Sequence, residues 1–185
     1  MTVTIEKGIA KGIVCAPPSK SMAHRNLICG ALSGGSVIRG VEYSQDILAT
    51  LDCLKSLGAK VDIDNDTVTI GNLSVDGKTD AVLNCRESGS TMRFLIPICL
   101  LFGSEITLTG SGKLLERPMD IYEKLCKDNG FYFYKDNDII KVSGKLTGGI
   151  YELDGEVSSQ FISGMLFALP LAENDSIINI KGELL

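Results

Sequence analysis

The chain has 185 residues, of which 44% are hydrophobic and 22% charged, enough apolar material for a packed core and too much for disorder. Its net charge of −5 disfavours a general nucleic-acid binder, because affinity for a polyanion needs a basic surface. The longest apolar run, residues 94–102, is shorter than the roughly 20 residues that a membrane-spanning helix needs. Neither nucleic acid nor a membrane is therefore expected as a partner.

Cysteine and histidine content bounds the chemistry further. We expect the cysteines to be small buried residues in a reducing cytoplasm, because no C-x-x-C spacing occurs. They are Cys15, Cys29, Cys53, Cys85, Cys99 and Cys126. With His24 as the single histidine, a histidine-based metal site is not expected, and we predict neither metal nor cofactor. The N-terminus also lacks the pattern of a signal peptide, which favours a cytoplasmic location.

The first predicted elements form a helix–strand–helix–hairpin unit. A helix is expected after Ser19, followed by a short strand over residues 36–39. A second helix is predicted from Ser44 to Gly58, since serine suits a helix start and glycine a helix end. Residues 58–70 contain an extended stretch, a polar turn and an alternating stretch, which is typical of a β-hairpin.

The next part of the chain repeats this order. It predicts a helix after residues 88–90, a strand over 105–109, a helix from Pro118 to Gly130 and a hairpin over 130–142. The two hairpins align from Gly58 and Gly130, an offset of 72, and each has an Asp-Asn-Asp turn. Internal repetition on this scale indicates that similar supersecondary units follow one another.

A third copy starts after residues 158–160 and includes a strand over 176–181. With a leading strand, each unit has the order β-α-β-α-β-β, so we predict an α/β (α+β) fold of repeated units around a pseudo-threefold axis. The third unit is predicted to be incomplete, without its second helix and hairpin. The alternative is a naturally short capping unit, since terminal repeats are often atypical.

Three predicted helices begin with serine-rich tripeptides, residues 19–21, 88–90 and 158–160. Helix starts carry unpaired N–H groups and partial positive charge, so they attract phosphate and carboxylate. If the units surround a threefold axis, these starts converge on one anion. Lys20 and Arg25 fall in the first two turns of the first helix, where cations are unfavourable unless an anion is bound. The alternatives are ordinary helix capping and solvated surface charges.

Two further residues are candidates for anion recognition. Arg117 precedes Pro118, and its planar guanidinium suits a carboxylate or phosphate, although a simple pair with Glu116 is the alternative. Gly89 lacks a side chain and lets a ligand approach the backbone closely.

The remaining polar residues near these positions are given lesser roles. Arg86 and Arg93 flank the second serine-rich start and are assigned to packing or to the general electrostatic field. His24 is interpreted as a neighbour of the site and not as a catalyst, because the sequence shows no carboxylate partner for it. Nucleotide binding has no support, since neither a Walker A motif nor GxGxxG is present.

Four motifs resemble the 5-enolpyruvylshikimate-3-phosphate synthase family, in that family's order and over nearly the whole chain. They are residues 18–25 (PSKSMAHR), 87–93 (ESGSTMR), 115–118 (LERP) and 155–164 (GEVSSQFISG). The resemblance implies an inverse α/β barrel of two domains, each with three β-α-β-α-β-β units. Residues 1–14 would then be a strand of the second domain, and residues 15–185 the N-terminal domain, truncated in its third unit.

The resemblance also implies a transferase. The enolpyruvyl group of phosphoenolpyruvate would move to the 5-hydroxyl of shikimate 3-phosphate, releasing phosphate, on the route to chorismate and the aromatic amino acids. No metal or cofactor would be needed. The C-terminal domain of the same enzyme would supply the general base, so this part alone would bind substrate weakly without turnover.

Site residues follow from the same resemblance. Lys20 would be catalytic and contact both substrates, and Gln160 would also contact both. The residues that bind shikimate 3-phosphate would further include Ser21, Arg25, Ser158 and Ser159. Those that bind phosphoenolpyruvate would include Gly89 and Arg117. Glu87 departs from the family, in which asparagine is frequent, so no ligand contact is assigned to its side chain.

Two other functions remain open from the sequence. One is a fragment of UDP-N-acetylglucosamine enolpyruvyl transferase, which has the same fold and donor, although the Ser-Lys-Ser-x-x-x-Arg segment and the Ser-Ser-Gln triplet favour the shikimate enzyme. The other is a non-catalytic anion-binding domain that keeps the repeat.

Overall fold

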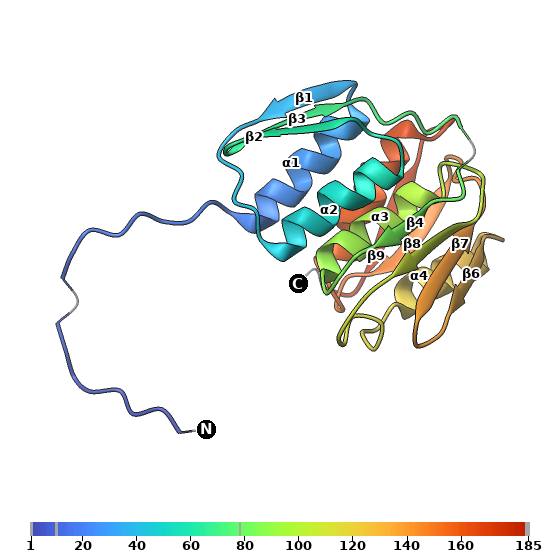
Figure 1. Ribbon diagram of the computed structural model, residues 1–185. Coiled ribbons are helices and arrows are strands. Elements are labelled where there is room, and N and C mark those ends of the chain that lie inside the picture. The colour runs from blue at the N-terminus through green and yellow to red at the C-terminus, as the bar shows by residue number, and fades with distance from the viewer. Residues whose placement is uncertain (1, 10, 78, 184–185) are drawn as a thin grey trace.

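The computed structural model describes residues 2–9, 11–77 and 79–183 (Figure 1). The elements in chain order are α1 (Lys20–Leu32), β1 (Gly35–Ile38), α2 (Gln45–Ser56), β2 (Val61–Asp64), β3 (Thr67–Gly71), β4 (Val82–Asn84), α3 (Gly89–Cys99), β5 (Ile106–Thr109), α4 (Asp120–Asp128), β6 (Tyr132–Lys135), β7 (Ile139–Ser143), β8 (Ile150–Asp154), α5 (Ser159–Ala168), the short 3-10 helix η1 (Leu169–Leu171) and β9 (Ile177–Lys181). This mixed content agrees with the predicted α/β class. Among these residues, no helix has both the length and the apolar character needed to cross a membrane.

The strands form three small sheets whose pairing follows the sequence repeat. The first has the order β1-β3-β2 and the second β4-β5-β7-β6, so β5-β7-β6 matches the whole of the first sheet. Both hairpins, β2–β3 and β6–β7, are antiparallel as predicted. The third sheet contains β8 and β9, which pair in parallel just as β4 and β5 do. The pseudo-threefold axis itself stays a prediction.

Helix α3 lies at the centre of the molecule. It contacts α5 on one side and α2 on the other, and α1 packs against both α2 and the first sheet (Figure 1). Most of its residues are buried, including Phe94, Leu95, Ile96 and Ile98, which belong to the main apolar cluster. A helix that is apolar on nearly every face needs such surroundings. Its first residues therefore have fixed neighbours on both sides.

Serine side chains begin four of the helices, as predicted. The hydroxyls of Ser19, Ser44, Ser88 and Ser158 each accept a hydrogen bond from a backbone N–H of the first turn, at 3.2–3.3 Å. The predicted start at Pro118 is wrong. Helix α4 begins at Asp120, and Met119 occupies the cap position without a side-chain hydrogen bond. Pro118 instead lies just before the cap.

The N-terminal segment contributes no strand to these sheets. Residues 2–9 and 11–14 have no regular structure and extend away from the body of the protein (Figure 1). Val3, Ile5 and Ile13 are largely exposed there. The assignment of this segment to a second domain, and of residues 15–185 to the first, stays a prediction.

Cysteine burial was predicted correctly for only part of the set. Cys53, Cys85, Cys99 and Cys126 are buried, whereas Cys15 and Cys29 are exposed, so the prediction is wrong for these two. Cys15 lies on the extended N-terminal segment, whose described residues are all exposed. All six thiols are free.

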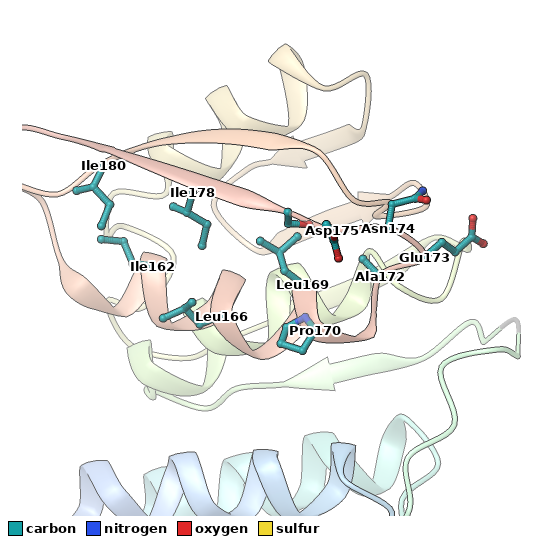
Figure 2. A pocket seen from close by; sticks show the side chains of 11 residues that line it. Ile162, Leu166, Leu169, Pro170, Ala172, Glu173, Asn174, Asp175, Ile178 and Ile180 are labelled. Carbon is teal, nitrogen blue, oxygen red and sulfur yellow. The ribbon is translucent and has the colours of Figure 1, made fainter.

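An apolar groove of about 630 Å³ lies between α5 and β9 (Figure 2). Ile162 and Leu166 line it from the helix, and Ile178 and Ile180 face them from the strand. The outer edge of β9 has no neighbouring strand among the described residues. None of the predicted substrate-binding residues lines this groove.

The closest approach of α3 and α5 depends on Gly164. A Cβ atom at this position would lie 2.3 Å from the Tyr122 hydroxyl and 2.6 Å from the Arg93 carbonyl oxygen. The single hydrogen of the Tyr122 hydroxyl is shared between that carbonyl, 2.7 Å away, and the carbonyl of Phe161, 3.0 Å away, so Tyr122 contacts both helices. A side chain at position 164 would displace the Tyr122 hydroxyl from these two carbonyls.

We expect Gly164→Ala to lower the free energy of unfolding by about 2 kcal/mol, because overpacking outweighs the higher helix propensity of alanine. Urea denaturation followed by circular dichroism measures this change. Gly77→Ala is the matched control, since a Cβ there meets no atom within 4 Å. An equal effect of the two substitutions would contradict the proposed role of Gly164.

Candidate anion-binding site

Most of the predicted site residues lie at the starts of α1, α3 and α5, whereas Arg25 lies in the second turn of α1 and Arg117 in the loop between β5 and α4. Lys20 is the first residue of α1, and its ammonium forms a 2.6 Å ion pair with Asp46 of α2. The lysine side chain remains about half exposed, at 55%. Its charge is thus held in place by Asp46 but stays accessible to solvent and to a ligand.

Arg25 connects α1 with α3 and α5. Its guanidinium donates to the backbone carbonyl of Ser21 at 3.0 Å and to the Ser163 hydroxyl of α5 at 3.4 Å. The same group lies 5.1 Å from the centre of the Phe94 ring, within the range of a cation–π contact. These contacts hold Arg25 at the junction of the three helices.

Arg117 lies directly against Gly89. A Cβ atom at Gly89 would be 2.5 Å from Nη1 of Arg117, so only glycine leaves room for the guanidinium in this position. The alternative pairing of Arg117 with Glu116 does not occur, since no ion pair between them is present. Gly89 itself is buried, and the exposed Arg117 lies against it at the start of α3.

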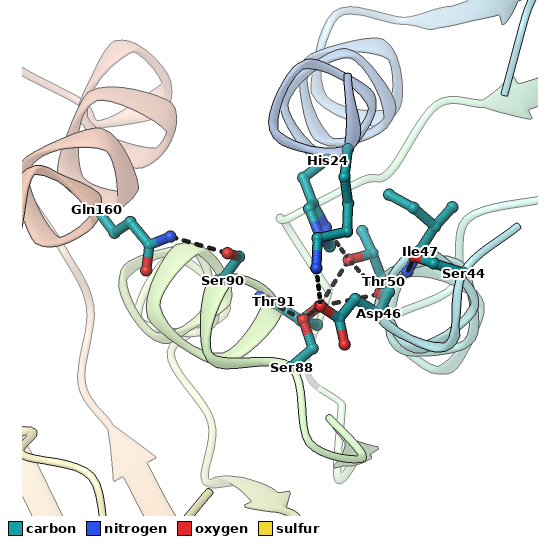
Figure 3. A network of polar contacts seen from close by, with 10 residues as sticks. His24, Ser44, Asp46, Ile47, Thr50, Ser88, Ser90, Thr91 and Gln160 are labelled. Carbon is teal, nitrogen blue, oxygen red and sulfur yellow. Dashed lines mark hydrogen bonds and ion pairs between the residues drawn. The ribbon is translucent and has the colours of Figure 1, made fainter. Parts of the chain in front are cut away.

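Gln160 links α5 to α3 through both atoms of its amide. Its Nε2 donates to the Ser90 hydroxyl at 2.8 Å (Figure 3), and its Oε1 accepts from Nη1 of Arg93 at 2.9 Å. Ser158, the cap of α5, and Ser159 are half-buried beside it. The orientation of the amide is therefore fixed by two opposite partners.

Arg93 is the residue of this group that the sequence analysis missed, having assigned it to packing or to the general field. It follows Gly89 by four residues, and this spacing places both on one face of α3, which was the available signal. Burial lowers the pKa of Arg93, and the positive charge of Arg117 lowers it further. Arg86, in contrast, pairs with Asp52 at 2.7 Å and is not part of the group.

Three of these arginines lack a carboxylate partner. The ion pairs of residues 2–9, 11–77 and 79–183 involve Lys20, Arg86 and four lysines, whereas Arg25, Arg93 and Arg117 form none. Three guanidiniums without counter-charge near helix starts produce a local positive field in an acidic protein. Such a field suits small anions that carry phosphate or carboxylate groups.

The described residues show no group of three or more His, Cys, Asp or Glu side chains arranged to hold a metal ion. Glu87, the departure noted in the second motif, lies with its carboxyl group against Gly112 in the loop after β5.

Comparison with known proteins agrees with this geometry. A family model described as EPSP synthase (3-phosphoshikimate 1-carboxyvinyltransferase) matches residues 6–184. The chain belongs to the EPSP synthase family. It is 46% identical over 186 residues to a 3-phosphoshikimate 1-carboxyvinyltransferase of Clostridium kluyveri, with 98% of this chain and 43% of the relative covered. An enzyme of the same name from Clostridium botulinum (strain Alaska E43) is 46% identical over 191 residues, with 99% and 44% covered.

Solved structures show the same relationship. An EPSP synthase from Acinetobacter baumannii superposes with a TM-score of 0.79 at 26% identity, over 93% of this chain and 41% of that one. A second structure from the same organism gives a TM-score of 0.77. The chain thus spans less than half the length of the relatives that it matches, and it has the fold of the corresponding part of these structures.

The positive charge of the arginines without ion pairs predicts that a simple anion stabilises the folded protein. We expect inorganic phosphate to raise the melting temperature of the wild type, because a ligand that binds only the folded state stabilises it. Each 1 kcal/mol gained corresponds to about 2–4 °C for a domain of this size. Arg93→Met should lose most of the rise, and differential scanning fluorimetry measures it.

Arg39→Met serves as the control, since Arg39 is exposed and belongs to no ion pair of the described residues. It should keep the full response to phosphate. If both variants respond like the wild type, Arg93 is not part of an anion site.

Proposed function

We propose that this chain binds shikimate 3-phosphate and phosphoenolpyruvate as the N-terminal part of a 3-phosphoshikimate 1-carboxyvinyltransferase. The observation that carries the proposal is the cluster of Arg25, Arg93 and Arg117, which lie within the family motifs and form no ion pair with the described carboxylates. Both substrates are small anions with phosphate groups, which match this cluster in charge and in hydrogen-bonding geometry.

The proposed roles divide the site into two halves. Lys20, Ser21, Arg25, Ser158 and Ser159 hold shikimate 3-phosphate, on the α1 and α5 side. In support, the Arg25 guanidinium bonds both Ser21 and Ser163 and so lies between these helices.

Phosphoenolpyruvate belongs on the α3 side. Gly89 and Arg117 hold it, supported by the contact of the guanidinium with the glycine backbone. Gln160 lies between the halves and contacts both ligands, and Lys20 also reaches both. The ammonium of Lys20 would have to leave Asp46 or share it, because the two now form an ion pair.

The proposed reaction joins the two substrates without a metal or cofactor. The 5-hydroxyl of shikimate 3-phosphate gives up its proton to a general base and its oxygen bonds to C2 of phosphoenolpyruvate, while C3 gains a proton, giving a tetrahedral intermediate. The C2–O bond to phosphate then breaks, C3 loses a proton, and inorganic phosphate leaves. Cations around the transferring group would stabilise the charge on the departing phosphate.

A second domain is the proposed partner, and it would bring the general base. Such a site works when two domains close and exclude water. A cytoplasmic location is part of the same proposal, since both substrates are metabolites.

We expect residues 1–185 alone to bind shikimate 3-phosphate weakly and to release no phosphate when phosphoenolpyruvate is added. Isothermal titration calorimetry measures the first, and a coupled phosphate-release assay the second. UDP-N-acetylglucosamine is the control ligand and should give no heat. Heat from the UDP-sugar would favour the alternative transferase, heat from none of the ligands would contradict the proposal, and sustained turnover would contradict the need for a second domain.

The Gly89–Arg117 contact gives a sharper test. Gly89→Ala should push the guanidinium away, since a Cβ there would meet Nη1 at 2.5 Å. Stability should change little, because the displaced group ends a flexible, exposed side chain. Affinity for phosphoenolpyruvate, measured in the presence of shikimate 3-phosphate, should fall by about tenfold or more, as expected for a lost charge-assisted hydrogen bond. Affinity for shikimate 3-phosphate alone should remain, and a loss of both would contradict the division of the site.

A further inference from the structure

Four buried polar side chains meet at the centre of the helical layer. They are His24, Thr50, Ser88 and Thr91, and each is at most 1% exposed. No other residue is classed as buried and polar or charged in the part of the chain that the structure describes. They come from α1, α2 and α3 and form a single network (Figure 3). Burying polar groups is costly unless they are paired, so their concentration in one place requires a reason.

The hydrogen bonds of this network run in one direction. Each hydroxyl has one hydrogen to donate. The hydrogen of Thr91 Oγ1 has two acceptors in reach, Ser88 Oγ at 2.7 Å and the Asp46 carbonyl oxygen at 3.4 Å, and it is assigned to the shorter contact with Ser88. The hydrogen between Thr50 and Thr91, also 2.7 Å apart, is then assigned to Thr50, for which the same Asp46 carbonyl is again farther away, at 3.4 Å. Thr50 then has none left for His24, whose Nδ1 lies 2.7 Å away. It follows that Nδ1 carries a hydrogen and donates it to Thr50.

In the neutral ring this hydrogen on Nδ1 leaves Nε2 bare. Nε2 has no hydrogen-bond partner among the described residues, and the Phe94 ring lies edge-on, 6.4 Å from the imidazole. Burial lowers the pKa of His24 to about 4, since it disfavours the charged form. Among the charged groups around it, Asp46 of α2 opposes this shift, and Lys20 and Arg25 of α1 add to it.

The chain of donors ends where the proposed site begins. Ser88 caps α3 and accepts from the backbone N–H of Thr91 as well as from its hydroxyl. The next residue is Gly89, which contacts Arg117. At the other end, His24 lies one turn after Lys20 on α1. The network thus joins the two helix starts to which the two substrates are assigned.

We infer that His24 is a positioning residue for the anion site that the proposed function requires. It acts through the hydroxyls of Thr50 and Thr91, and it sets the place of the first turn of α3 relative to that of α1. The neutral ring with hydrogen on Nδ1 is the form that does this. A charged ring would add a cation beside Lys20 and Arg25, and the other tautomer would reverse the chain of donors.

The tautomer can be observed directly, because the chain has one histidine. Long-range ¹H–¹⁵N NMR spectra should show a protonated Nδ1 and an unprotonated Nε2 at pH 7, with titration only near pH 4. Unfolding free energy should accordingly fall as the pH drops from about 6.5 toward 4, where the unfolded state binds the extra proton. A ring with hydrogen on Nε2, or one that titrates near pH 6.5, would overturn the inference.

Two substitutions separate the hydrogen bond from the volume of the side chain. His24→Asn keeps a donor in the place of Nδ1–H, whereas His24→Leu removes it. We expect the leucine variant to bind shikimate 3-phosphate and phosphoenolpyruvate about tenfold less tightly and to show faster amide exchange at Gly89 and Ser90, and the asparagine variant to restore both. Asn26→Leu, at an exposed position of α1, should behave as the wild type.

Thr91→Val keeps the test decisive if His24→Leu does not fold. It interrupts the network with a side chain of similar shape, and Thr69→Val, on an exposed face of β3, is its control. Unchanged affinity and amide exchange in Thr91→Val, or equal losses in His24→Asn and His24→Leu, would overturn the positioning role. If the wild type binds neither substrate, the proposed function fails, while the tautomer and the exchange at Gly89 still decide whether the network holds α3.

Discussion

The start of helix α3 is the point on which the rest of the structure depends. The helix is buried along most of its length, so its axis is set by apolar packing against α2 and α5. Its first turn is set by polar contacts, with the His24 network on one side and Gln160 on the other. Apolar packing and directional hydrogen bonds therefore both fix the position of the first turn of α3. Hydrophobic packing alone is non-directional and would allow the helix to slide or turn slightly.

The distribution of charge also distinguishes the region around the helix starts. The protein is acidic overall, yet Arg25, Arg93 and Arg117 form no ion pair with the described carboxylates, whereas lysines elsewhere form surface ion pairs such as Lys141 with Glu105. Exposed pairs of that kind contribute little to stability. Leaving guanidiniums without a partner costs stability, and it concentrates positive potential where the helix dipoles already favour an anion. Sites that violate local rules in this way are commonly functional.

Much of this architecture was predictable from the sequence because its signals are local. Capping serines predicted the starts of α1, α2, α3 and α5, and the Asp-Asn-Asp turns predicted both hairpins. The positions of β4 and β8 were not predicted, although each unit was expected to begin with a strand, because short strands of three and five residues have weak periodicity. The contact of Arg117 with Gly89 and the bridge from Arg93 to Gln160 join residues far apart in the chain, and only tertiary packing brings them together. The spacing of four residues between Gly89 and Arg93 on α3 indicated that both lie on one face, but no sequence pattern predicts that Arg93 bonds to Gln160.

The uneven burial of the cysteines has a practical consequence for chemical labelling. Burial raises the pKa of Cys85 and Cys99 well above the ordinary value, and that of Cys126 to about 12, so these thiols are almost never in the reactive thiolate form. Maleimides and spin labels added to the native protein will react with Cys15 on the extended segment and with the exposed Cys29. A Cys29→Ser background would leave Cys15 as the single exposed thiol, a reporter on that segment five residues before Lys20 at the start of α1.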